Sequence, residues 1–137
     1  MNRNVRIAAY AVIAVAALVI TELQYFPFPS GGIAGFWAQM KANHITRGIT
    51  VDLAFFVLAG SLFMICEARR LSIRFVWLYV VLGYLINISV FFPIFMIVRE
   101  RAMARAGEEA SAFTLTDMIL VAGITGAEIW TIWFVLQ

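Results

Sequence analysis

Four long apolar runs, separated by short polar connections, set the pattern of this chain. They cover residues 6–24, 47–66, 75–98 and 115–137 approximately. The third run has no charged residue from Phe75 to Val98, which is about 36 Å of helix and more than a bilayer core needs. The pattern predicts an all-α integral membrane bundle of four transmembrane helices, forming a single domain over residues 1–137.

A shorter amphipathic segment follows the first run. Ile33, Phe36, Trp37 and Met40 have the spacing i, i+3, i+4, i+7, which marks one apolar face of a helix. We expect a short helix over about residues 32–42 that lies in the membrane interface, with Phe36 and Trp37 as anchors. An aromatic and proline-rich break at residues 25–29 separates it from the first run.

The connections give three local predictions. The short basic turn Glu67–Arg74 makes the second and third runs antiparallel neighbours. Pro93 cannot donate to the carbonyl of Ser89, so a kink is expected there. The third helix should end at Gly107, and Thr114–Asp117 matches a capping box that begins the fourth.

The composition agrees with a membrane protein. The chain of 137 residues is 64% hydrophobic and 13% charged, whereas soluble domains average about 25% charged residues. A net charge of +2, with no basic face interleaved with aromatics, argues against nucleic acid as a partner. The arginines at the ends of the runs are instead expected to anchor the chain at the lipid headgroups; they include Arg69, Arg70, Arg74, Arg99 and Arg101.

Four spans put both termini on one side of the membrane, together with the Glu67–Arg74 turn. That side would hold Arg3, Arg6, Arg69, Arg70 and Arg74, and the other would hold Lys41, Arg47, Arg99, Arg101 and Arg105. With five basic residues on each side the positive-inside rule does not choose. The tight cluster in the short turn favours an N-terminus inside the cell.

Polar side chains within the apolar runs are the candidates for chemistry. Spans one and three end on the side on which spans two and four begin, so one leaflet should hold Glu22, His44, Asp52, Asp117, Arg99 and Arg101. Asn87 and Ser89, with Tyr84 nearby, would point into that half of the bundle. The sequence predicts a polar pocket made by Asp52, Glu22, Asn87, Ser89, Tyr84 and Glu128.

Each of the two acids deepest in the runs has more than one interpretation. Asp52 could donate a proton or anchor a ligand, or it could stabilise the first turn of its helix or pair with Arg47 or Arg99. Glu128, near the middle of the fourth run, could be functional, could hydrogen-bond to Asn87, a tyrosine or a threonine, or could meet another subunit.

The usual catalytic and cofactor devices are missing from the sequence. A single histidine, His44, and a single cysteine, Cys66, leave no set of metal ligands at the usual spacings and no disulfide. No phosphate-binding loop, catalytic triad or haem motif is present. The sequence therefore predicts no metal site and identifies no cofactor.

Several short motifs resemble, in their order and spacing, one known family. They are Gly35-Phe36-Trp37, Val51-Asp52-Leu53, Glu67-Ala-Arg-Arg-Leu71, Trp77, Phe92-Pro93-Ile94-Phe95 and Arg99-Glu-Arg101. The family consists of short bacterial membrane proteins catalogued as domain of unknown function 2834. The resemblance covers about Ile20 to Arg105, with Ile94 in place of an expected leucine. It implies a multi-pass protein of the bacterial inner membrane and supplies no activity.

Three functions remain open at this stage. The first is a non-enzymatic accessory subunit or a binder of an apolar ligand (lipid, isoprenoid or pigment), with membrane lipids as partners and a homo-oligomer or larger complex as its setting. The second is an enzyme that uses Asp52, Glu128 or Glu22 as a general acid on a hydrophobic substrate; the acid-bearing bundle is loosely similar to membrane terpene cyclases. The third is a small proton-coupled transporter.

Overall fold

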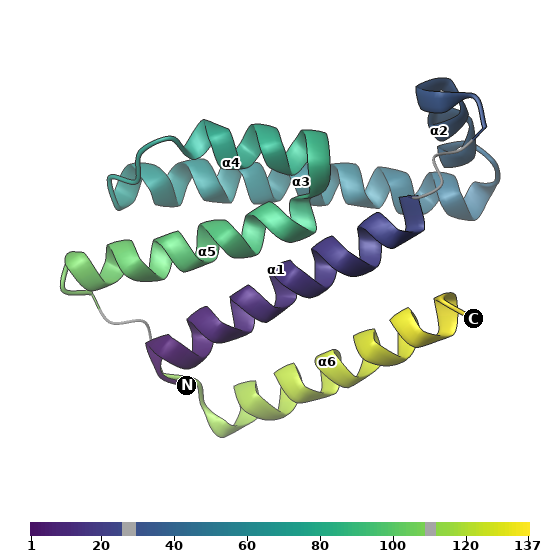
Figure 1. Cartoon of the computed structure of the whole chain (residues 1–137). Helices are drawn as coiled ribbons and strands as arrows, with labels where there is room; N and C mark the ends of the chain where they lie inside the picture. Colours follow the sequence, from purple (N-terminus) through teal and green to yellow (C-terminus); the bar gives the residue numbers. More distant parts are fainter. Residues whose placement is uncertain (26–29, 109–111) are drawn as a thin grey trace.

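The structure, a computed structural model, describes residues 1–25, 30–108 and 112–137. Its elements are α1 (Arg3–Tyr25), α2 (Gly32–Met40), α3 (His44–Arg70), α4 (Val76–Leu82), the π-helical turn η1 (Gly83–Asn87), α5 (Ile88–Arg105) and α6 (Leu115–Val135) (Figure 1). Every regular element in the described ranges is helical, which confirms the predicted all-α fold. Residues 26–29 of the aromatic and proline-rich break lie outside the described part.

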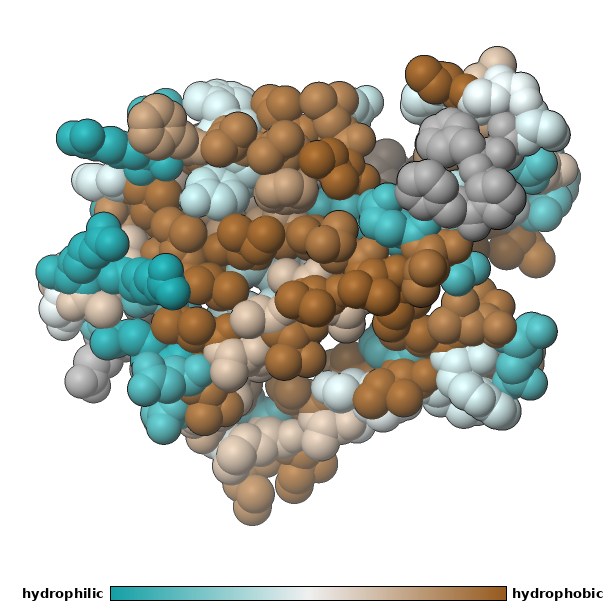
Figure 2. Space-filling view, viewed as in Figure 1, coloured by the Kyte–Doolittle hydropathy of each residue, from teal (hydrophilic) through white to brown (hydrophobic). Residues whose placement is uncertain are grey.

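Four helical stretches are long enough and apolar enough to cross a membrane. They are Arg3–Tyr25, His44–Arg70, Val76–Arg105 and Leu115–Val135, with mean hydropathies between 1.7 and 2.3. Apolar side chains cover much of the outer surface of the molecule (Figure 2). A surface of this kind suits hydrocarbon rather than water, so the predicted membrane bundle is confirmed.

The third apolar run reverses direction at Asn87 instead of continuing as one rod. The Asn87 backbone is extended (φ −165°, ψ 116°), and α4 and α5 run in opposite directions on either side of it (Figure 1). The ring centroids of Tyr79 and Phe95 are 5.8 Å apart, whereas a straight helix would separate the two residues by about 24 Å. Residues 76–105 therefore form a helical unit that we call the α4–α5 hairpin.

Local chemistry accounts for the place of the reversal. A Cβ atom at Gly83 would lie 3.0 Å from Cδ1 of Ile88, so glycine lets the two arms approach closely. Asn87 then caps α5, because its Oδ1 accepts a hydrogen bond of 2.9 Å from the Ser89 N–H. Pro93 lies buried inside α5, beyond the reversal, and the kink expected at Pro93 stays a prediction.

The reversal brings both ends of the hairpin to the end of the bundle at which α1 begins (Figure 1). Arg99, near the end of α5, binds Glu67 near the end of α3, with 2.6 Å between Nε and Oε2. Glu100 binds Arg6 in the second turn of α1, with 2.9 Å between Oε2 and Nη2. These ion pairs fix the direction of α5 relative to both α1 and α3.

Two expectations about sidedness are therefore wrong. Arg99, Arg101 and Arg105 lie at the same end of the bundle as the N-terminus, not at the opposite end. The two termini also lie at opposite ends, because α6 begins beside the N-terminus and runs away from it (Figure 1). One unforeseen reversal inverts the direction of every later element.

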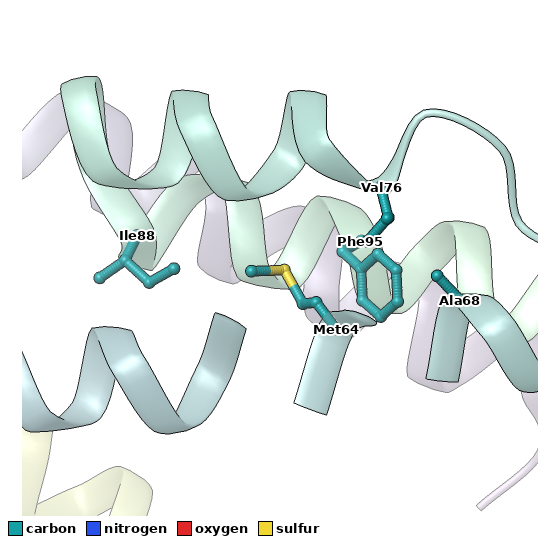
Figure 3. Packing of buried hydrophobic residues seen from close by; sticks show 5 residues of the cluster. All are labelled: Met64, Ala68, Val76, Ile88 and Phe95. Carbon is teal, nitrogen blue, oxygen red and sulfur yellow. The ribbon is translucent and has the colours of Figure 1, made fainter. Parts of the chain in front are cut away.

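The core lies between α3 and the two arms of the hairpin. Its buried members are Met64, Ala68, Val76, Ile88 and Phe95 (Figure 3). Met64 and Phe95 are fully buried, and α1 packs along α5 on the other side of the hairpin. By contrast α6 has no buried residue, and it stands apart from the other helices (Figure 1).

The smaller predictions about helix ends are confirmed. Helix α5 ends at Arg105, and Gly107 follows with a left-handed backbone (φ 71°). In the capping box of α6, the Asp117 N–H donates to Thr114 Oγ1 at 3.2 Å and the Thr114 N–H donates to Asp117 Oδ2 at 2.8 Å. Helix α2 covers Gly32–Met40 and has no buried residue, while its place in the membrane interface stays a prediction.

Candidate functional site

Eight of the ten basic residues of the chain gather at one end of the bundle, which we call the arginine end. They are Arg3 and Arg6 of α1, Arg69 and Arg70 of α3, Arg74 of the following connection, and Arg99, Arg101 and Arg105 of α5. Lys41 and Arg47 lie at the opposite end, beside α2 and the start of α3. The sequence predicts five basic residues on each side of the membrane. The structure instead places eight at one end of the bundle and two at the other.

The most buried polar contact of the arginine end joins α1 to α5. Arg6 binds Glu100 through two hydrogen bonds, Nε to Oε1 at 3.0 Å and Nη2 to Oε2 at 2.9 Å. The two side chains are only 6% and 2% exposed, and Arg6 Nη1 also donates to the Met1 carbonyl at 2.7 Å. A paired arrangement of this kind satisfies both charges away from solvent, so removal of either partner would leave a buried charge.

A second group of ion pairs surrounds Glu67. Its carboxylate accepts from Arg99 at 2.6 Å and from Arg70 at 2.9 Å. Arg70 also binds Glu108, which follows α5, and the guanidinium of Arg99 lies over the Phe63 ring at 5.9 Å from its centroid. These contacts hold the end of α3 against the end of α5, residues 99–105, which we call the foot of the hairpin.

The opposite extreme of the hairpin, residues 84–87, is the hairpin tip. Tyr84, Leu85 and Ile86 are 73%, 70% and 50% exposed. The Nδ2 atom of Asn87 is shielded from solvent and has no hydrogen-bond partner among the described residues. The tip therefore combines exposed apolar side chains with an unsatisfied amide.

The tip lies close to the middle of the membrane-spanning bundle. From Arg99, at the arginine end, α5 runs back to Asn87 over about 18 Å of helix, and a bilayer hydrocarbon core is about 30 Å thick. In this part of the bundle α5 packs on α3. The Phe92 ring of α5 lies against Gly60 of α3, and a Cβ atom added to Gly60 would be 3.6 Å from that ring. An irregular piece of backbone thus lies about half-way along the bundle.

The polar residues expected to share one leaflet lie at two ends of the bundle. Glu22 lies near the end of α1 and Asp52 in α3, at the end opposite the arginine end, whereas Asp117 opens α6 at the arginine end. The expectation of one leaflet holding Glu22, His44 and Asp52 together with Asp117, Arg99 and Arg101 is therefore wrong, because it assumed a straight third span.

The alternative pairings proposed for the deep acids are also not formed in the described part of the chain. Asp52 makes no ion pair with Arg47 or Arg99, and Arg99 is bound to Glu67 instead. Glu128 makes no hydrogen bond to Asn87 and lies on a helix without buried residues. Ligand binding by Asp52, Glu22, Asn87, Ser89, Tyr84 and Glu128 stays a prediction.

The sequence reasoning missed Glu100 and the pairing of Arg6. Both looked like ordinary flanking charges, and no local pattern distinguishes Glu100 from its arginine neighbours. The signals that would have found the reversal are Gly83 and Asn87, four residues apart, where a glycine permits close approach and an asparagine favours a helix start. In the described ranges, no group of three or more His, Cys, Asp or Glu residues could hold a metal ion.

Comparison with protein-family models places the chain in a known family. A family model described as a protein of unknown function (DUF2834) matches residues 9–101, which run from α1 to the foot of the hairpin and leave out α6. Neither the curated proteins nor the solved structures gave a match.

Proposed function

The chain belongs to the DUF2834 family of unknown function, and from its own geometry we propose that it is a non-enzymatic accessory subunit of a larger membrane assembly. In this proposal a partner protein covers the hairpin tip. The observation that carries it is the exposed, irregular tip at mid-depth, with Asn87 Nδ2 unpaired.

The argument rests on what hydrocarbon can solvate. Lipid offers no hydrogen bonds, so irregular backbone at membrane depth persists where protein covers it or where it lines a water-filled cavity. Tyr84, Leu85 and Ile86 give the tip an apolar surface, which a protein partner can cover while it supplies an acceptor for the Asn87 amide. A buried donor without a partner costs about 1–3 kcal/mol, so a partner would gain that amount at this point.

Helix α6 supports the same proposal. None of its residues is buried, and a Cβ atom at Gly123 or Gly126 would meet nothing within 4 Å. Small residues on a membrane helix allow another helix to approach closely, and Glu128 at mid-helix would then find its hydrogen-bond partner on that helix. The enzyme alternative lacks comparable support, because Asp52 and Glu128 make no contact that would hold them in one site in the described part of the chain.

We also propose the orientation of the chain. Basic residues close to membrane helices are retained on the cytoplasmic side, and the arginine end holds eight of them against two at the other end. The N-terminus, the α3–α4 connection and the α5–α6 connection are then cytoplasmic, and the C-terminus lies outside. The location expected from the family is a bacterial inner membrane.

Transport is the second candidate, because irregular backbone at mid-depth can also line a water-filled path. Asn87 would then offer its free amide to a passing solute rather than to a partner protein. The two candidates differ in what touches the tip, protein or water.

Site-specific photocrosslinking in native membranes tests the proposal. A benzophenone amino acid replaces Tyr84, 73% exposed at the tip, and in a matched control it replaces Val12, 68% exposed on α1. We expect a discrete protein adduct from position 84 and none from position 12. Lipid adducts alone at both positions would contradict the subunit proposal. Reaction of a cysteine at position 84 with a water-soluble thiol reagent, in a Cys66→Ser background, would favour the transport candidate.

A further inference from the structure

The connection between α3 and α4 has a strained backbone. Ser72 (φ 53°) and Phe75 (φ 60°) are the non-glycine residues with positive φ in the described ranges. The left-handed region is uncommon for any residue with a Cβ atom and is a true outlier for a bulky one such as phenylalanine. Strain of this kind persists where the surroundings impose it, and it is frequent at binding sites. At Ser72 this conformation ends α3, because the Ile73 N–H donates to the Ala68 carbonyl at 2.8 Å, as in the common left-handed helix ending. Phe75, which precedes α4, has no side-chain cap bond.

This connection shapes a surface hollow of about 480 Å³, which we call the Ser72 hollow. Arg69, Ser72, Arg74 and Trp77 contribute to its lining, together with Phe75. Two arginines and one serine thus contribute to one concave surface at the arginine end. Trp77 and Phe75 are 57% and 79% exposed, so an apolar surface lies immediately beside the charged one.

The two arginines of the hollow have no charged partner in the described part of the chain, unlike several neighbouring arginines. Arg6, Arg70 and Arg99 are each bound to a glutamate. Arg69 and Arg74 make no ion pair or hydrogen bond with the residues that the structure describes. Arg101 and Arg105 are also exposed and unpaired there, but they do not line the hollow. The two arginines of the hollow are therefore available for an external anion.

We propose that the Ser72 hollow binds the phosphate group of an anionic phospholipid. Arg69 and Arg74 hold the phosphate oxygens, since guanidinium groups match phosphate geometry, and the Ser72 hydroxyl donates a further hydrogen bond. The acyl chains pass beside Trp77 and Phe75, in the position that aromatic residues favour at the membrane interface. This inference is independent of the proposed partner at the hairpin tip.

Native mass spectrometry of the full-length protein in a neutral detergent, titrated with dioleoyl phosphatidylglycerol, tests the proposal. Loss of both charges in the double variant Arg69→Gln/Arg74→Gln should weaken binding by roughly 20- to 30-fold, at about fivefold per arginine. The matched control is Arg101→Gln/Arg105→Gln, which removes the same charge from the same end and should stay within about threefold of the wild type. The variant Arg69→Lys/Arg74→Lys keeps both positive charges. It provides a second measurement of lipid binding if the glutamine variant unfolds.

The outcomes separate the possible sources of the phosphate. Glycerol phosphate, which has the headgroup without the acyl chains, should fail to displace the lipid at equal concentration. Displacement by glycerol phosphate would show a site for soluble phosphate and overturn the lipid assignment. Equal losses in both glutamine variants, or unchanged binding in Arg69→Gln/Arg74→Gln, would overturn the site itself.

Discussion

The foot and the tip of the α4–α5 hairpin satisfy their polar groups in opposite ways. At the foot, Glu100 is fully buried and bound to Arg6 through both carboxylate oxygens. At the tip, the Asn87 amide has no partner among the described residues and Tyr84 is 73% exposed. The Glu100 carboxylate is fully bound by Arg6, although Arg3 Nε at the same end of the bundle has no partner among the described residues. The Asn87 amide at the tip calls for a partner from outside the chain. The comparison predicts that substitutions at the foot change stability and that substitutions at the tip change association.

The largest effect is expected at the foot. Glu100→Ala would leave the Arg6 guanidinium buried without its partner, which costs about 3–5 kcal/mol. Unfolding of the purified protein in detergent, followed by circular dichroism against a denaturant, measures the change. Arg6→Met/Glu100→Met should recover most of the loss, because an apolar pair leaves no uncompensated charge. A loss below about 1 kcal/mol for Glu100→Ala would place this contact among ordinary surface pairs.

The next effect concerns the close approach of the two arms. Gly83→Val would force side-chain atoms against Ile88, already 3.0 Å from a Cβ at position 83, at a cost of about 1–3 kcal/mol. Gly123→Val in α6 is the matched control, since a Cβ there meets nothing within 4 Å. The same denaturation experiment compares them. Equal stabilities for the two variants would mean that the arms do not meet at Gly83.

A smaller effect separates two asparagine caps. Asn43→Ala removes the cap that accepts from the Thr46 N–H and should cost about 1 kcal/mol. Asn87→Ala removes a similar cap, which lowers stability, but it also removes the unpaired amide, which raises it. The net change in the free energy of unfolding should therefore be within about 0.5 kcal/mol of zero. The tip variant should instead lose its partner in co-purification from native membranes. Greater destabilisation by Asn87→Ala than by Asn43→Ala would contradict the account of the tip.

The smallest effect is expected from removal of α6. Because no residue of α6 is buried, a chain that ends at Thr114 should keep the stability of the remaining helices within about 0.5 kcal/mol. Thermal unfolding of the shortened and full-length proteins in the same detergent makes the comparison. A drop of several degrees would show that α6 packs on the bundle.

Sequence reasoning found the apolar runs, the capping box at Thr114 and the helix stop at Gly107, because each depends on neighbours in the chain. It did not find the reversal at Asn87, since an uninterrupted apolar run has the same hydropathy whether it continues or folds back. The side of the membrane on which Arg99 lies depends on the reversal at Asn87. The pairing of Glu100 with Arg6 depends on the same reversal. Contacts between distant segments follow from topology, which local patterns do not encode.

The path of the third apolar run can be tested most directly by labelling single cysteines in intact cells with a membrane-impermeant thiol reagent. In a Cys66→Ser background, the probes are Ser72→Cys before the hairpin, Ala106→Cys after it and Gln137→Cys at the C-terminus. The account predicts that positions 72 and 106 are both protected, and that position 137 is labelled. Labelling of position 106 with protection of positions 72 and 137 would show that the third run crosses the membrane, and the hairpin would be refuted.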